Sequence, residues 1–233
     1  MDVLIKRLLD SGFERHVVES RGYLIVSCVP GAGKSTFIRD LIASDSRFVA
    51  CTFGKPDKIS NAGNRILDVR AVEDYNGAYL ICDEFQEGDW KALKACCFFG
   101  DLEQSFLDQG NIKPNFTLTK TLRFGSSTCT LLQSFGFKIT SEKQDEVLIN
   151  SPENAIIHPN IIAIGTQAEK LLCYYRLEFK RPGEVRGCTF DKVTLLTDYN
   201  TITEELRSEF YVALTRHRAC LEIVCPDATF APA

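Results

Sequence analysis

Short hydrophobic runs of strand length recur along the chain, and more polar, helix-compatible stretches separate them. Most runs end at Gly, Pro, Asp or a similar residue that interrupts regular structure. Such runs are typical of buried parallel strands, which are apolar on both faces. The pattern therefore predicts an α/β fold with mainly parallel sheets. The predicted strands cover residues 23–28, 48–53, 78–82, 95–99, 156–164, 171–179, 193–197 and 220–225.

Two further patterns concern the ends and the middle of the chain. Leu4, Ile5, Leu8 and Leu9 fall on one face of a helix, which predicts that the first helix packs against its own domain. The Gly-Ser-Ser stretch after Phe124 predicts a domain boundary, with domains at 1–125 and 126–233.

Composition narrows the class of protein. Hydrophobic residues make up 45% and charged residues 25% of the 233, as in ordinary globular chains. No stretch approaches the ~18 uninterrupted apolar residues of a membrane span, and the charged N-terminus is a poor signal peptide, so we expect a protein without a transmembrane segment, made in the cytosol. The ten cysteines show no CxxC spacing, which favours reduced core residues over a zinc site. The net charge of -4 means that RNA binding would need a local basic groove.

The strongest chemical signal is the segment from Cys28 to Thr36, which reads Cys-Val-Pro-Gly-Ala-Gly-Lys-Ser-Thr. It follows a predicted strand, precedes a predicted helix and matches the end of the P-loop pattern, with Cys28 in place of the first glycine. Glycines allow backbone N–H groups to approach phosphates, and the helix N-terminus favours the anion. Lys34 would reach the β- and γ-phosphates, and the Ser35 hydroxyl would bind Mg²⁺. The predicted nucleotide-binding residues are Pro30, Gly31, Ala32, Gly33, Lys34, Ser35 and Thr36.

An acidic pair, Asp83 and Glu84, directly follows the predicted strand 78–82. The carboxyl end of a parallel strand is where ligands of open α/β sheets bind. Asp83 would complete the Mg²⁺ site with Ser35, and Glu84 would orient and deprotonate the attacking water. ATP, or another nucleoside triphosphate, and Mg²⁺ are the predicted cofactors.

Two more sequence motifs indicate a protein family. Gly100-Asp-Leu-Glu-Gln104 follows another predicted strand, and Tyr211-Val-Ala-Leu-Thr-Arg216 lies near the C-terminus. With the P-loop and Asp83-Glu84, in this order, they resemble the virus-encoded branch of superfamily 1 helicases. A nucleoside kinase, another P-loop enzyme, has no use for the last block. The chain is similar over nearly its whole length to the triple gene block protein 1 family of potexviruses, carlaviruses and their relatives.

The resemblance implies a fold and catalytic roles. It implies two tandem RecA-like P-loop domains with a nucleotide cleft between them. Gln104 would sense the γ-phosphate, and Arg123 and Arg216 would act as arginine fingers on the transferring phosphoryl group. With Lys34 and Glu84 they complete the predicted catalytic set.

An RNA groove is the least specific expectation. Residues 183–190 resemble the helicase motif near the nucleic acid, although Arg186-Gly-Cys-Thr189 stands where the family commonly has Gln-Gly-x-Thr. Basic residues and tyrosines between 170 and 192 could contact phosphates and stack on bases, or form the solvated face of a half-exposed strand. The candidate RNA contacts are Thr52, Tyr174, Lys180, Arg181, Arg186 and Thr189.

The resemblance also implies partners and a place of action. Such proteins bind single-stranded viral RNA, carry the genome from cell to cell through plasmodesmata and suppress host RNA silencing. They self-associate and act with the viral capsid protein, the small triple gene block membrane proteins and a host silencing factor. Host cytoplasm, plasmodesmata and inclusion bodies are the expected locations. Two hypotheses share every motif: an RNA-stimulated triphosphatase, and a binding and suppressor protein whose hydrolysis is slow or regulatory.

Overall fold

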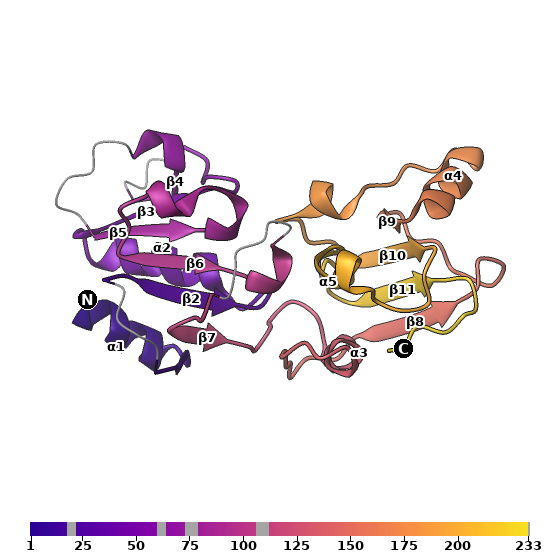
Figure 1. Cartoon of the computed structure of the whole chain (residues 1–233), viewed down its shortest axis with the longest axis horizontal. Helices are drawn as coiled ribbons and strands as arrows, with labels where there is room; N and C mark the ends of the chain where they lie inside the picture. The colour runs from indigo at the N-terminus through magenta and orange to yellow at the C-terminus, as the bar shows by residue number, and fades with distance from the viewer. Residues whose placement is uncertain (18–21, 60–63, 73–78, 106–111, 233) are drawn as a thin grey trace. The chain divides into compact units, whose positions relative to one another are not determined.

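The apolar runs of the first half form the centre of a seven-stranded sheet, in the order β1-β7-β2-β6-β5-β3-β4 (Figure 1). The computed structural model describes residues 1–17, 22–59, 64–72, 79–105 and 112–232. The pairings are parallel except that of β1 with β7. The strands are β1 (Glu14–Arg15), β2 (Leu24–Cys28), β3 (Phe48–Thr52), β4 (Leu67–Asp68), β5 (Tyr79–Asp83), β6 (Cys97–Gly100) and β7 (Phe116–Leu118).

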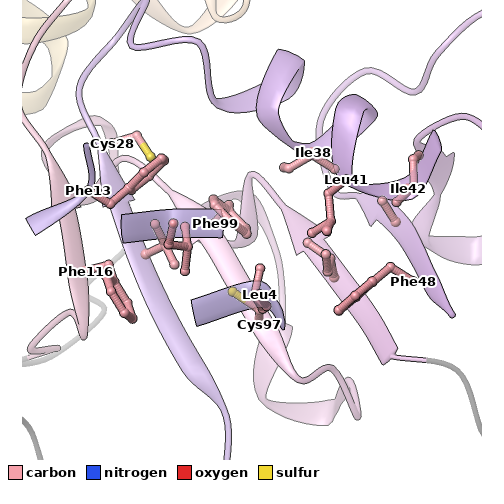
Figure 2. Packing of buried hydrophobic residues seen from close by; sticks show 14 of the residues in the cluster. Leu4, Phe13, Cys28, Ile38, Leu41, Ile42, Phe48, Cys97, Phe99 and Phe116 are labelled. Carbon is pink, nitrogen blue, oxygen red and sulfur yellow. The ribbon is translucent and has the colours of Figure 1, made fainter. Parts of the chain in front are cut away.

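Both faces of this sheet are buried, which explains the continuous apolar runs. Side chains on one face, such as Val26, join a core with helices α1 (Asp2–Asp10) and α2 (Lys34–Ser44). Figure 2 shows Leu4 of α1 and Ile38 of α2 in the same cluster as Phe99 of β6. The prediction that the first helix packs on its own domain is therefore confirmed for Leu4 and Leu8.

The opposite face carries an aromatic cluster. Trp90 packs edge-on against Phe98, Phe85 and Tyr23, with ring centroids 4.9, 5.3 and 6.0 Å away. Short 3-10 helices cover this face and the sheet edge: η1 (Val69–Ala71), η2 (Phe85–Glu87), η3 (Trp90–Ala92) and η4 (Leu102–Gln104).

The second half of the chain builds its own four-stranded sheet in the order β8-β11-β10-β9, and all three pairings are parallel. The fold is therefore α/β with mainly parallel sheets. The strands are β8 (Glu146–Asn150), β9 (Ile161–Ile164), β10 (Lys192–Thr197) and β11 (Cys220–Val224). The helices are α3 (Ser126–Ser134), α4 (Thr166–Tyr174) and α5 (Arg207–Leu214), with 3-10 turns η5 (Pro182–Val185) and η6 (Glu204–Leu206).

The expected strand at 171–179 is wrong, because residues 166–174 form helix α4. Ala168 and Leu172, four residues apart, are buried on one face of this helix, which is the helical period. Asp198, after β10, accepts N–H bonds from Gln167 and Ala168 and so caps the helix from a distant strand. Gly165, with a φ of +113°, leaves room for that carboxylate. Of the expected strand at 156–164, only residues 161–164 form a strand, β9. The sequence pattern does not predict β8.

The chain folds as two compact units, Met1–Thr119 and Lys120–Ala233. The division falls before Lys120, whereas the sequence placed it after residue 125. Residues 120–125 join the second unit because Thr121 N donates to Thr140 O and Ser141 Oγ donates to Phe124 O. Among the described residues, none of the helices is both long and apolar enough to cross a membrane. All ten cysteines are free thiols.

Candidate functional site

The glycine-rich segment forms the turn between β2 and α2, as its sequence predicts. Gly31 and Gly33 have φ angles of +76° and +90°, a region that residues with a Cβ rarely adopt. Helix α2 begins directly after Gly33, so its first backbone N–H groups line the turn. This arrangement suits an anionic ligand at the helix N-terminus.

Cys28 ends β2 where the usual motif has glycine. Its side chain is 1% exposed and belongs to the apolar core near Phe13 (Figure 2). Burial raises the pKa of the Cys28 thiol well above its ordinary value. The cysteine therefore serves as a small core residue, and the turn itself does not depend on a glycine at this position.

Lys34 and the acidic pair meet at the end of this turn. The Lys34 ammonium donates to Asp83 and, over 2.6 Å, to Glu84 Oε1. Burial works against the charge on Lys34, but the two carboxylates outweigh it and raise the pKa of Lys34. Burial also raises the pKa of Asp83, against the lowering effect of Lys34. The three groups thus form one charge cluster, in which Asp83 is buried and Lys34 and Glu84 are partly exposed.

Ser35 and Asp83 offer two oxygen ligands side by side. Ser35 Oγ lies 3.3 Å from Asp83 Oδ2 and donates to it. Hydroxyl and carboxylate oxygens are the donors that Mg²⁺ prefers, and proteins hold this ion by few side chains. The residues present therefore fit the predicted metal.

Glu84 has an unusual backbone, with a φ of +51°. Its amide donates to Asp83 Oδ1 over 3.0 Å, and Gln86 Nε2 donates to Glu84 Oε2 over 2.6 Å. A Cβ on Gly54 would lie 3.1 Å from Glu84 Cγ, so the turn after β3 packs closely on the glutamate. Left-handed backbone at a non-glycine residue is uncommon and is concentrated at functional sites.

A further carboxylate lies at the end of β6 and received no role from the sequence. Asp101 is 4% exposed, and it accepts N–H bonds from Gln104 Nε2 over 2.7 Å and from the Glu103 amide over 3.2 Å. Burial raises the pKa of Asp101 to about 7. Gln104 is thereby oriented by Asp101. The Gly-Asp-x-x-Gln spacing could have revealed this, because a carboxylate three residues before an amide can accept from it across one turn.

In the second unit the structure brings Arg123 and Arg216 to the same residue. Arg123 Nη1 donates to Thr215 O over 3.0 Å, and Arg216 Nη2 donates to Thr215 Oγ1 over 2.8 Å. Arg216 Nε also donates to Val212 O over 2.9 Å, and its side chain is 1% exposed. The two arginines are 93 positions apart in sequence numbering, and the end of α5 joins them.

The candidate RNA contacts differ widely in exposure and partners. Thr52 is buried, and its hydroxyl accepts from the Gly54 amide. Tyr174 and Tyr175, at the end of α4, are 80% and 63% exposed and lie edge-on to each other at 5.1 Å. Lys180 lies over the Phe190 ring, and Arg181 pairs with Glu169 over 2.7 Å. Arg186 and Thr189 are half-buried in the segment before β10.

Comparison with known proteins relates the chain to viral helicases. A family model described as the viral superfamily 1 RNA helicase core domain matches residues 24–225. The "Movement and silencing protein TGBp1" of Poplar mosaic virus (isolate ATCC Pv275) is 45% identical over 234 residues, covering 100% of both chains. The protein of the same name from Chrysanthemum virus B is 36% identical and covers 99% of both.

Two solved structures share the fold. The helicase nonstructural protein 10 of an arterivirus superposes with a TM-score of 0.54 at 18% identity, covering 96% of this chain and 56% of the helicase. The PRRSV helicase gives 0.57 at 19% identity, covering 90% and 54%. The chain thus spans about half the length of these helicases.

Proposed function

We propose a function from the premise that this chain belongs to the viral superfamily 1 RNA helicase family and to the movement and silencing proteins of plant viruses. The proposal is an Mg²⁺-dependent nucleoside triphosphatase that acts on single-stranded viral RNA. The observation that carries it is the cluster of Lys34, Asp83 and Glu84 at the P-loop, in which the ammonium pairs with both carboxylates.

The relatives are named for movement and silencing, and we extend both roles to this chain. The protein would support transport of viral RNA between host cells through plasmodesmata and would suppress host RNA silencing. The partners proposed with this role are the viral capsid protein, the small triple gene block membrane proteins, a host silencing factor and further copies of the chain. Its proposed location is the host cytoplasm, with plasmodesmata and inclusion bodies as sites of accumulation.

The charge cluster suggests how the partners of Lys34 change when a nucleotide binds. Lys34 is neutralised by two carboxylates, so phosphate oxygens must replace Asp83 and Glu84 as its partners. That exchange moves the ammonium onto the phosphates and leaves both carboxylates available. Glu84 then accepts a proton from the attacking water, while Gln86 holds its other oxygen in place.

Ser35 and Asp83 are the residues that would hold Mg²⁺, which would neutralise charge on the β- and γ-phosphates when bound. Asp101 orients Gln104 by accepting its amide N–H bond. Gln104, oriented in this way, senses the γ-phosphate and its water in the proposed mechanism, which is the role predicted from the family motif.

We further propose that each unit is a RecA-like domain, and that Arg123 and Arg216 act on the nucleotide held by the first unit. Their shared attachment to Thr215 supports a joint role. A positive charge placed on the transferring phosphoryl group stabilises the transition state.

The decisive experiment is steady-state ATP hydrolysis with and without single-stranded RNA. We expect Lys34→Ala to lower turnover roughly 100-fold or more, because one charged partner of the transferring group is lost. Lys94→Ala is the matched control, since Lys94 is an exposed lysine of the same unit, and its turnover should equal that of the wild type.

Comparing ATP hydrolysis with and without RNA distinguishes the two candidate functions. Turnover that rises with RNA and is lost in Lys34→Ala would support the coupled triphosphatase. Turnover that ignores RNA would favour the second candidate, a binding and suppressor protein with regulatory hydrolysis. Slow hydrolysis in that candidate would follow from the ion pairs of Lys34, because they must break before phosphate binds. A wild-type protein with no hydrolysis would overturn the enzymatic proposal.

A further inference from the structure

Directly after Arg216, the side chain of His217 is completely buried in a polar network. His217 Nε2 lies 3.1 Å from Asp145 Oδ2 and 2.9 Å from Thr128 Oγ1. The Thr128 hydroxyl donates to the same Asp145 oxygen over 2.6 Å. The Phe124 ring stacks on the imidazole with centroids 5.6 Å apart and an interplanar angle of 29°. Buried polar groups of this kind are costly unless they are joined in a network.

The carboxylate partner determines the hydrogen-bond role of one ring nitrogen. Burial works to raise the pKa of Asp145, but the bonds from His217 and Thr128 outweigh it and lower the pKa to about 2. Asp145 is therefore a carboxylate that can only accept, and His217 Nε2 must be the donor. Nδ1 is buried and has no hydrogen-bond partner among the described residues. The ring is held by one edge and one face, and its orientation is set by Asp145.

Asp145 also ties this histidine to helix α3. Its second oxygen, Oδ1, accepts the backbone N–H groups of Ser127 and Thr128, which are in the first turn of α3. A carboxylate is stabilised at a helix N-terminus by the dipole and by these donors. One carboxylate therefore joins His217 to the start of α3.

Both arginines attach to the chain segments that this network clamps. Arg123 lies next to Phe124, which stacks on His217, and its guanidinium donates to Thr215 O. Arg216 precedes His217, and its carbonyl accepts from the Phe190 amide. Moving the imidazole would shift the segments around Phe124 and Thr215 together, and with them the two guanidinium groups.

We propose that His217, held by Asp145 and Thr128, is a positioning residue that sets Arg123 and Arg216 for phosphoryl transfer. This rests on the proposed function, in which the two arginines act on the nucleotide. His217 itself touches neither nucleotide nor water in this role. A displacement of about 1 Å in a catalytic group can cost roughly 100-fold in rate.

The test measures kcat and KM for ATP in the full chain, together with the affinity for a non-hydrolysable ATP analogue. His217→Ala should lower kcat roughly 10- to 100-fold while KM and analogue affinity change less than about threefold, because the P-loop belongs to the other compact unit. His217→Gln places an amide N–H within reach of Asp145 and should recover part of the lost kcat.

Two threonines of α3 give a matched pair that avoids loss of the ring. Thr128→Val removes the hydroxyl that contacts His217 and Asp145, and it should lower kcat about threefold to tenfold. Thr130→Val removes an exposed hydroxyl that donates to the Ser126 carbonyl, and it should leave kcat unchanged. If His217→Ala does not fold, the comparison of Thr128→Val with Thr130→Val tests the positioning role.

The possible results distinguish the positioning role of His217 from the proposed triphosphatase function. A wild-type enzyme that hydrolyses ATP, with Arg216→Ala inactive and both Thr128→Val and His217→Ala normal, would overturn the positioning role and leave the proposed function intact. A kcat loss that His217→Gln does not reduce, accompanied by equal loss of analogue binding, would mark a structural role and also overturn it. Absence of hydrolysis in the wild type would overturn both.

Discussion

At the scale of single residues, burial and pairing set the charges of the candidate site. Asp83, Glu84 and Lys34 share one cluster, whereas Asp101 has amide partners and, within the described part of the chain, no cation bonded to it. A buried carboxyl without an opposite charge prefers its neutral form. This is why the pKa of Asp101 rises to about 7, far from the ordinary value of 3.8.

This shift predicts a pH dependence of stability. Because the folded-state pKa is the higher one, the folded protein binds the proton between about pH 4 and pH 7, where the unfolded chain has lost it. The stabilising contribution of the neutral form is therefore present at low pH and is lost as the pH rises through about 7. Asp101→Asn should flatten the fall in the free energy of unfolding between about pH 4 and pH 7.

The one tryptophan, Trp90, provides the readout, since it is buried in the first unit beside Phe98. Urea unfolding followed by its fluorescence measures the stability of that unit. Equal pH slopes for the wild type and Asp101→Asn would contradict the assignment.

At the scale of elements, α4 combines a buried face with an unusual exposed end. Ala168 and Leu172 pack on β9 and β10, while Tyr174 and Tyr175 project into solvent. Lys170 and Arg176 flank the tyrosines and are also exposed. Exposed aromatic rings beside cations are a sequence-tolerant platform for single-stranded nucleic acid.

We predict that Tyr174→Ala and Tyr175→Ala each weaken single-stranded RNA binding by about 1 to 3 kcal/mol, the usual worth of one stacked base. Leu177→Ala is the control, because Leu177 is 40% exposed in the same segment but has no ring. Fluorescence anisotropy of a labelled oligonucleotide at fixed salt concentration gives the affinities. If all three changes weaken RNA binding equally, the segment contributes through its apolar surface in general. Stacking of bases on the two tyrosine rings would then be excluded.

At the scale of the whole molecule, the predicted chemistry is divided between two compact units. The P-loop, Asp83 and Glu84 belong to Met1–Thr119, and Arg123 and Arg216 belong to Lys120–Ala233. Each unit has its own sheet and its own buried cluster. Nucleotide binding and catalysis are therefore expected to be separable.

We predict that the fragment Met1–Thr119 binds an ATP analogue with affinity close to that of the full chain. Its ATP turnover should be lower by a factor of about 1,000 or more, which is the usual contribution of an arginine finger. Calorimetry on the fragment and a phosphate-release assay measure the two quantities. Full-chain turnover by the fragment alone would remove the arginines from the mechanism.

The central strands of both units were predictable because they are buried along most of their length, whichever way a side chain points. Residues 48–53 are apolar except for Thr52, and β3 covers 48–52. Segment 171–179 is similarly rich in apolar residues, yet α4 extends to Tyr174. A short apolar run does not distinguish strand from helix, and here the cap from Asp198 decides.

The candidate site divides in the same way. The positions of Lys34, Asp83 and Glu84 followed from local motifs, because a strand end and a tight glycine turn place side chains without help from distant residues. The contacts of Asp101 with Gln104, of Arg123 with Thr215 and of His217 with Asp145 were not foreseen. The last two pairs join residues far apart in the chain, so no local pattern encodes them.

The sequence by itself therefore determined the α/β class, the order of the central strands along the chain, the phosphate turn and the acidic pair. Each of these depends on backbone sterics or on periodicity within about ten residues. Only the tertiary structure decided that Lys34 pairs with both carboxylates, that Thr215 joins two arginines and that His217 is buried on Asp145. These contacts arise because parallel strands bring their ends together at one edge of a sheet, where residues distant in sequence become neighbours.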